Sequence, residues 1–163
     1  MSFFIGVDPG KSGAMSFIDG DGTLVDVVDL PVLAGELLVL DFQSLLLAHS
    51  ATPRVAIEEP FANRAASSVS QMNQGIFYGT LLGVIQANEI PLERIKPQRW
   101  KAEMEIPMGS KFSPAEKKEM SRRRASDLWP SMSDLWGRKT DHDRAEAALV
   151  GECLRRRSLG SHR

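Results

Sequence analysis

The chain contains little cysteine and no long apolar run. Its single cysteine, Cys153, excludes an intrachain disulfide and a zinc site built from several cysteines, and it favours a reducing compartment. No apolar stretch is long enough to cross a membrane, and the first residues lack the basic-then-apolar pattern of a secretory signal. We therefore expect a cytoplasmic protein without a membrane partner.

Charge is distributed unevenly along the 163 residues, whose length suits one folded domain. Residues 1–93 contain 3 Lys/Arg and 11 Asp/Glu, a net charge of −8, whereas residues 94–163 contain 17 and 10, a net charge of +7. An acidic half followed by a basic half indicates a polyanionic partner for one face of the molecule. The alternative is that the two halves neutralise each other across the folded surface.

Two predicted strands end in carboxylates. The apolar run 3–7 ends at Asp8, and the run 54–58 ends at Glu58. Burying an unpaired carboxylate costs several kcal/mol, so Asp8 either caps a turn or faces a cation. Neighbouring strands lie about 4.8 Å apart, which lets two such acids share one ion. Three further strands are predicted at 13–18, 23–30 and 91–96, the first two of these joined by a tight turn.

Helices are predicted between and after these strands. The predicted helices span 41–49, 65–89, 97–101 and 140–157, and a further helix starts at the capping box of Ser113. Asp41 is a possible cap of the first helix, and residues 158–163 are expected to form a disordered tail. Within 65–89, three glycines recur every four residues, at 75, 79 and 83. Because glycine weakens a helix, this stripe indicates a closely packed partner, either the sheet or a second protomer.

The last predicted helix carries two further acids. Asp143 and Glu146 are three residues apart, so both project from one side of its first turn. Such acids often only complement the helix dipole. If they instead meet Asp8 and Glu58, four carboxylates repel one another unless hard cations lie between them. Mg²⁺, with Mn²⁺ as a substitute, suits such oxygen ligands, and paired ions support in-line attack on a phosphodiester.

Basic residues concentrate around the capping box. The loop before it contains Lys111, and the helix after it contains Lys117, Lys118, Arg122, Arg123 and Arg124. A basic helix is often a solvated face, but beside an irregular loop in the positive half of the chain it favours contact with phosphates.

Three motifs in order resemble the RuvC family of Holliday-junction resolvases, in its phage-type branch. They are Ile5-Gly6-Val7-Asp8-Pro9-Gly10 with Ser12-Gly13, then Ala56-Ile57-Glu58, then Asp143-x-x-Glu146-Ala147. The resemblance implies an α/β, ribonuclease H-like fold, a five-stranded mixed sheet with helices on both faces, over residues 1–157. It also implies a homodimer that the glycine-striped helix helps to build, in a bacterial or phage-infected host cell.

The resemblance also implies roles for individual residues. Asp8, Glu58, Asp143 and Glu146 would hold Mg²⁺, Lys101 and Lys117 would act on the phosphate, and Phe61 would probe bases at the junction centre. The family usually has aspartate where this chain has Glu146, and Asp141 and Lys118 compete with Asp143 and Lys117. A packed core residue is the alternative for Phe61, and a place beside the metal ligands or in solvent is expected for His142.

The expected function is Mg²⁺-dependent cleavage of four-way DNA junctions at symmetric positions. Two alternatives share the fold: cleavage of forks and flaps, and junction binding without cleavage. A nucleotide site of the actin or sugar-kinase type also begins with Asp-x-Gly, but it normally requires two domains, and 163 residues are too few.

Overall fold

A central strand with both faces covered organises the fold. The computed structural model describes residues 2–61 and 65–160, and all six residues of β1 (Phe3–Asp8) are buried. Strand β1 pairs antiparallel with β2 (Ala14–Asp19), which pairs antiparallel with β3 (Leu24–Asp29). On its other side it pairs in parallel with β6 (Arg54–Glu58), which pairs in parallel with β7 (Leu92–Ile95). The sheet is therefore mixed and five-stranded, as predicted, and its strand order is β3-β2-β1-β6-β7.

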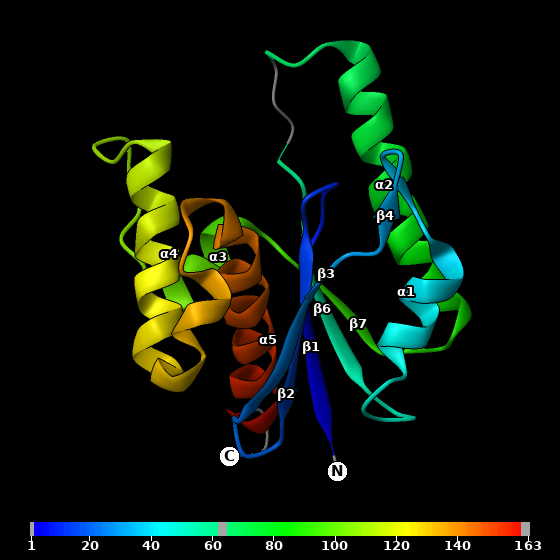
Figure 1. Cartoon of the computed structure of the whole chain (residues 1–163), viewed down its shortest axis with the longest axis horizontal. Coiled ribbons are helices and arrows are strands. Elements are labelled where there is room, and N and C mark those ends of the chain that lie inside the picture. Colours follow the sequence, from blue (N-terminus) through cyan, green and yellow to red (C-terminus); the bar gives the residue numbers. More distant parts are fainter. Residues whose placement is uncertain (1, 62–64, 161–163) are drawn as a thin grey trace.

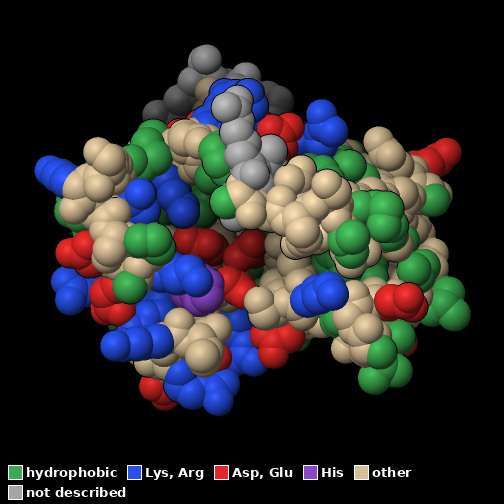
Figure 2. All heavy atoms as spheres, turned by 90° about the horizontal axis from the view of Figure 1, so that it is seen from above, with side chains coloured by type: hydrophobic (Ala, Val, Ile, Leu, Met, Phe, Trp, Pro, Cys, Tyr) green, Lys and Arg blue, Asp and Glu red, His purple; other side chains and the backbone are tan. Residues whose placement is uncertain are grey.

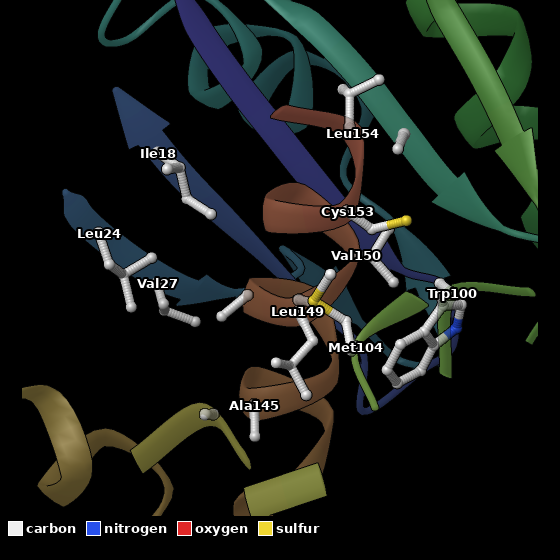
Figure 3. Packing of buried hydrophobic residues seen from close by; sticks show 14 of the residues in the cluster. Ile18, Leu24, Val27, Trp100, Met104, Ala145, Leu149, Val150, Cys153 and Leu154 are labelled. Atoms are coloured by element: carbon white, nitrogen blue, oxygen red, sulfur yellow. The ribbon is translucent and has the colours of Figure 1, made fainter. Parts of the chain in front are cut away.

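Helices cover both faces of this sheet (Figure 1). On one face lie α5 (His142–Gly160), α4 (Pro114–Leu128) and α3 (Pro97–Glu103), with the 3-10 helices Pro130–Trp136 and Lys139–Asp141. On the other lie α1 (Val39–Leu46) and α2 (Ser68–Ala87), beside the small hairpin of β4 (Val32–Leu33) and β5 (Glu36–Leu37). Each face has its own apolar core, and Figure 3 shows the one under α5. Among the described residues, no helix combines the length and apolar character that a membrane span needs.

Helix α5 lies in backbone contact with β1. A Cβ placed on Gly6 would lie 2.1 Å from the carbonyl oxygen of Ala147 and 2.3 Å from the amide nitrogen of Gly151. Ser16 fixes the contact, because its hydroxyl donates to the Ala147 carbonyl at 2.8 Å and accepts from the Gly6 amide at 3.3 Å. The small residues Ala147 and Gly151 of α5 therefore allow this close approach, and they set the start of the helix against the end of β1.

Replacing Gly6 with alanine is expected to destabilise the protein by at least about 2 kcal/mol, since overpacking at a backbone contact forces α5 away from the sheet. Urea unfolding followed by circular dichroism measures this. Gly20→Ala is the matched control, because its added Cβ would meet no described atom closer than 3.9 Å. Equal unfolding midpoints for the two variants would contradict the packing described.

Several element boundaries differ from those predicted. The segment 31–40 contains a hairpin whose strands are only two residues long, too short for any periodicity to show. Its turn is tight, since Ala34 and Gly35 have φ values of 51° and 81°. Helix α1 begins after Leu38, so Asp41 lies in its first turn and does not cap it. Helix α5 reaches Gly160, so the predicted tail is wrong for 158–160, where buried Ser158 lies in the last turns of the helix; 161–163 lie outside the described residues.

The glycine stripe of α2 does not press against the sheet. A Cβ on Gly75, Gly79 or Gly83 would meet no described atom within 4 Å. The sheet-facing side of α2 is instead formed by Phe77, Leu81 and Ile85, and residues two apart in a helix point in nearly opposite directions. Of the two partners considered, the sheet is excluded, and a second protomer stays a prediction.

Candidate active site

Three predicted acids converge at one end of the sheet. Asp8 ends β1, and Asp143 and Glu146 project from the first turn of α5, which the Gly6 contact holds against that strand. One carboxylate oxygen from each lies within 4.8 Å of the other two. Residues 135 and more positions apart in the chain thus form one acidic cluster, which we call the acid triad (Asp8, Asp143 and Glu146).

The acid triad carries more negative charge than the protein neutralises. Burial raises the pKa of Asp8 well above its usual range, and the charges of Glu146, Glu58 and Asp143 raise it further. Lys101 Nζ lies 3.2 Å from Glu146 Oε1, and among the described residues it is the only lysine or arginine that pairs with the triad. One cation among several carboxylates leaves a site that suits a hard divalent ion with oxygen ligands.

Glu58 stands beside the triad, outside its set of mutually close oxygens. It accepts a hydrogen bond at Oε2 from the indole N–H of Trp100, a fully buried side chain. Burial, followed by the charge of Glu146, raises the pKa of Glu58 to about 7, against the lowering effect of the Trp100 hydrogen bond. The predicted four-acid set is therefore three acids that meet and a fourth held by an indole, and metal binding by Glu58 stays a prediction.

Replacing Trp100 with phenylalanine is expected to slow any metal-dependent activity of the site at least about tenfold, because Glu58 loses the donor that orients it. Trp136→Phe is the matched control: Trp136 is equally buried, and its indole donates to Ser126 Oγ at 2.9 Å, away from the acids. Both variants should lose similar stability in thermal unfolding. Equal activity of the two variants would show that the Trp100 hydrogen bond does not support the function of the site.

Other polar side chains hold the triad in place. Ser12 Oγ donates to Asp143 Oδ2 at 2.8 Å, His142 Nε2 lies 2.6 Å from Asp143 Oδ1, and buried Ser121 donates to Glu146 Oε1 at 2.9 Å. Glu146 thus contacts α4 through Ser121 while its carboxylate remains in the triad. His142 lies beside the acids, as expected.

Asp141 takes no part in the triad. Arg138 binds both of its oxygens, at 2.9 Å each, and this hydrogen bonding lowers the pKa of Asp141. The geometry favours Asp143 over Asp141 as the third acid, since Asp141 is paired with Arg138 and Asp143 lies in the triad; metal binding by Asp143 stays a prediction.

The two candidate lysines of α4 face different ways. Lys117 lies one turn before Ser121, whose hydroxyl also contacts the Lys117 carbonyl, so the two share the face toward the triad. Lys118 borders a separate groove with Arg122 and Lys139. The geometry favours Lys117, although no direct contact joins it to an acid of the triad.

The arginine cluster is largely occupied by contacts within the chain. Arg122 binds Glu119 and the carbonyls of Trp136 and Gly137, and Arg124 binds Glu105 and the Met104 carbonyl. Arg123 also contacts Glu119, but its side chain is 77% exposed. Phosphate binding by all three stays a prediction, and Arg123 is the member best placed for it.

Two of the predicted DNA-contacting residues are exposed. Lys111 is exposed, with its Nζ 5.0 Å above the ring of Phe112. Phe61 is 70% exposed, which excludes the alternative of a packed core residue. Figure 2 looks onto this end of the molecule and shows acidic side chains in a central hollow with lysines and arginines along its rim.

The comparisons with known proteins bear on the fold. No family model matches the chain, and no curated protein matches it in sequence. Among solved structures, RuvC of T. thermophilus in complex with a Holliday junction substrate matches with a TM-score of 0.59 and 16% identity, covering 96% of each chain. The chain has the RuvC fold. A second structure, RuvC of Thermus thermophilus, matches with a TM-score of 0.54 and 16% identity, over 96% of this chain and 95% of that one.

The RuvC fold confirms the fold that the three motifs implied, the ribonuclease H-like α/β arrangement. At 16% identity the likeness extends to the arrangement of the backbone, and the chemistry has to be argued from the acid triad itself. Sequence reasoning missed Ser12, Trp100 and Ser121 as partners of the acids. Two of these partners lie in or next to sequence features already singled out: Ser12 belongs to the first motif, and Trp100 directly precedes Lys101.

Proposed function

We propose that this protein is a Mg²⁺-dependent endonuclease that resolves four-way DNA junctions, acting as a homodimer. The observation that carries the proposal is the acid triad, buried and under-neutralised, at the end of β1 in a chain with the RuvC fold. The matching RuvC structure holds a Holliday junction substrate, which supports junction DNA as the substrate here.

Asp8, Asp143 and Glu146, with Glu58 beside them, would hold Mg²⁺, for which Mn²⁺ substitutes. Bound ions of this kind supply Lewis acidity at a phosphate and lower the pKa of an attacking water. The protein's own contribution is positioning: Ser12 and His142 orient Asp143, Ser121 and Lys101 orient Glu146, and Trp100 orients Glu58.

Lys101 and Lys117 would offset negative charge on the phosphate as the bond breaks, because both lie on helices beside the triad. Lys111, Lys118 and the arginines of α4 would contact backbone phosphates without reading sequence. Phe61, exposed at the end of β6, would contact bases at the junction centre.

One active site cuts one strand, so paired cuts require two protomers. Helix α2 offers the surface for a second copy, since Val69, Met72 and Ile76 are each about 60% exposed and lie along one stripe. A two-fold symmetric dimer matches the symmetry of a four-way junction. The products would be symmetric nicks with 5′-phosphate and 3′-hydroxyl ends.

The test is cleavage of a synthetic four-way junction, labelled in each strand, with Mg²⁺ and with EDTA. Mg²⁺-dependent nicks at symmetric positions in opposite strands are the expected result. A panel of forks and flaps of the same sequence separates a junction resolvase from a broader branched-DNA nuclease. Tight binding in Ca²⁺ without any product in Mg²⁺ would instead identify a junction-binding protein that does not cut.

A further inference from the structure

A cavity of about 370 Å³ lies next to the end of β1, on the α2 side of the sheet. Its walls come from the loop after β1, from Pro60 and from the first turns of α2. Pro9 directly follows Asp8, and Pro60 is two residues after Glu58, so the cavity opens at the edge of the sheet where both acids end their strands. We call it the base pocket.

The lining of the base pocket combines flat apolar surfaces with a few polar groups. Pro9, Pro60 and the ring of Phe77 supply the apolar walls, and the side chains of Asn73 and Gln74 supply amide donors and acceptors. Such a combination is typical of pockets that hold a planar ring and recognise its edge. The volume is at the low end for ligand pockets, too small for stacked base pairs.

Tyr78 supplies a second, independent sign of a ligand. Its hydroxyl oxygen is buried and has no hydrogen-bond partner among the described residues, and burial raises the pKa of this side chain. Leaving a buried hydroxyl without a partner costs about 1–3 kcal/mol. Tyr78 lines the same cavity as Asn73 and Gln74, and a small shift of its side chain would bring the hydroxyl to a ligand with hydrogen-bonding groups on a planar edge.

The positive charge of a lysine at the cavity favours a nucleotide over an apolar ligand. Exposed Lys11 also borders the cavity, and a lysine at the rim suits the phosphate attached to a base held inside. Unpaired bases at a branch point cost less to unstack than bases in a duplex. Phe61 follows Pro60, which lines the cavity, and its ring is exposed. This ring can stack on the base that remains in the duplex when its neighbour is unstacked.

We propose that the base pocket receives one unstacked nucleobase next to the cleaved phosphate and that Asn73, Gln74 and Tyr78 distinguish among the four bases. This proposal rests on the proposed function, because it gives that function a preference for the cleavage sequence. Hydrogen-bonding edges differ among the bases, and a well-placed pair of contacts discriminates about tenfold or more.

The first measurement is binding, which requires no cleavage. Junctions carry 2-aminopurine, whose fluorescence rises on unstacking, at each nucleotide flanking the branch point, and the protein is added in Ca²⁺. A rise at one position is expected with the wild type and with the control Gln86→Ala, an exposed change further along α2. Asn73→Trp, which fills the pocket, should remove the rise while thermal unfolding stays unchanged. No rise at any position, or a rise that persists in Asn73→Trp, would overturn the proposal.

The second measurement is cleavage with each of the four bases, and an abasic nucleotide, at that position. Wild-type rates should vary about tenfold or more among the bases, and Asn73→Ala and Tyr78→Phe should narrow the range to about twofold. Equal wild-type rates for all five would overturn the base pocket but leave the nuclease intact. If nothing is cut in Mg²⁺, the proposed function fails, and the fluorescence measurement still decides whether the pocket takes a base.

Discussion

Asp8→Asn is expected to slow Mg²⁺-dependent junction cleavage by at least about a thousandfold, since a lost metal ligand removes several kcal/mol of transition-state stabilisation. The same change should raise the melting temperature of the metal-free protein at pH 8. Asp8 is buried among other carboxylates, so a neutral side chain of the same shape removes repulsion. Each kcal/mol gained raises the melting temperature by about 2–4 °C in a protein of this size.

The pH dependence of stability follows from the direction in which folding shifts the pKa values of Asp8 and Glu58. The pKa of Asp8 is raised, and that of Glu58 is raised to about 7, so the folded protein binds these protons more tightly than the unfolded chain. The stabilising contribution of these two acids is therefore fully present below their unfolded pKa of about 4 to 4.5, and it is lost as the pH rises through their raised folded pKa values, about 7 for Glu58. Metal-free wild type should lose stability over this interval, and Asp8→Asn should lose less.

Thermal unfolding at pH 5 and pH 8, once in EDTA and once in Mg²⁺ without EDTA, measures these effects. Mg²⁺ should stabilise the wild type at pH 8 and should have little effect on Asp8→Asn, because a ligand stabilises only the state that binds it. Asp127→Asn, an exposed acid of α4, is the matched control and should behave as the wild type. A variant of Asp8 that melts below the wild type in EDTA, or that still cuts junctions, contradicts the account.

Ile76→Glu is expected to convert a dimer into a monomer. Val69, Met72 and Ile76 are 63%, 59% and 61% exposed on one stripe of α2, and a carboxylate buried within this stripe would prevent a second copy from packing there. Sedimentation should show a mass near 18.0 kDa for the variant and about twice that for the wild type. Paired cuts within one junction should fall at least about tenfold, leaving single nicks.

The control for this experiment is Leu159→Glu, since Leu159 is 50% exposed near the end of α5 and far along the chain from α2. It should remain a dimer and make paired cuts. A monomeric wild type, or a dimeric Ile76→Glu variant, would show that the exposed stripe of α2 is not the interface.

The sequence predicted the fold because its signals are local. Apolar runs that end in Asp8 and Glu58 predict two strands, and the spacing of Asp143 and Glu146 predicts one face of a helix. The meeting of these acids in one site was implied by the resemblance to the RuvC family, and the structure brings three of them together. Partners of the acids were not predictable in this way. Trp100 and Glu58 are 42 positions apart, and Ser12 and Asp143 are 131 apart, so only the packed structure brings them together.

Surface roles were harder still to predict. The number of basic residues on α4 suggested that its arginines bind DNA phosphates. The number alone does not show which of these arginines already pair with Glu119 or Glu105. The glycine stripe likewise indicated a closely packed partner but did not identify it. The sheet is excluded because Phe77, Leu81 and Ile85 form the side of α2 that faces the sheet, and the glycines lie on the other side.

The central claim is that the acid triad exists to bind divalent ions. Crystals soaked in Mn²⁺ and measured at its absorption edge test this most directly. The account predicts anomalous density between the carboxylates of Asp8, Asp143 and Glu146 in the wild type, and none there in Asp8→Asn. Wild-type crystals at saturating Mn²⁺ with no density at the triad would contradict it.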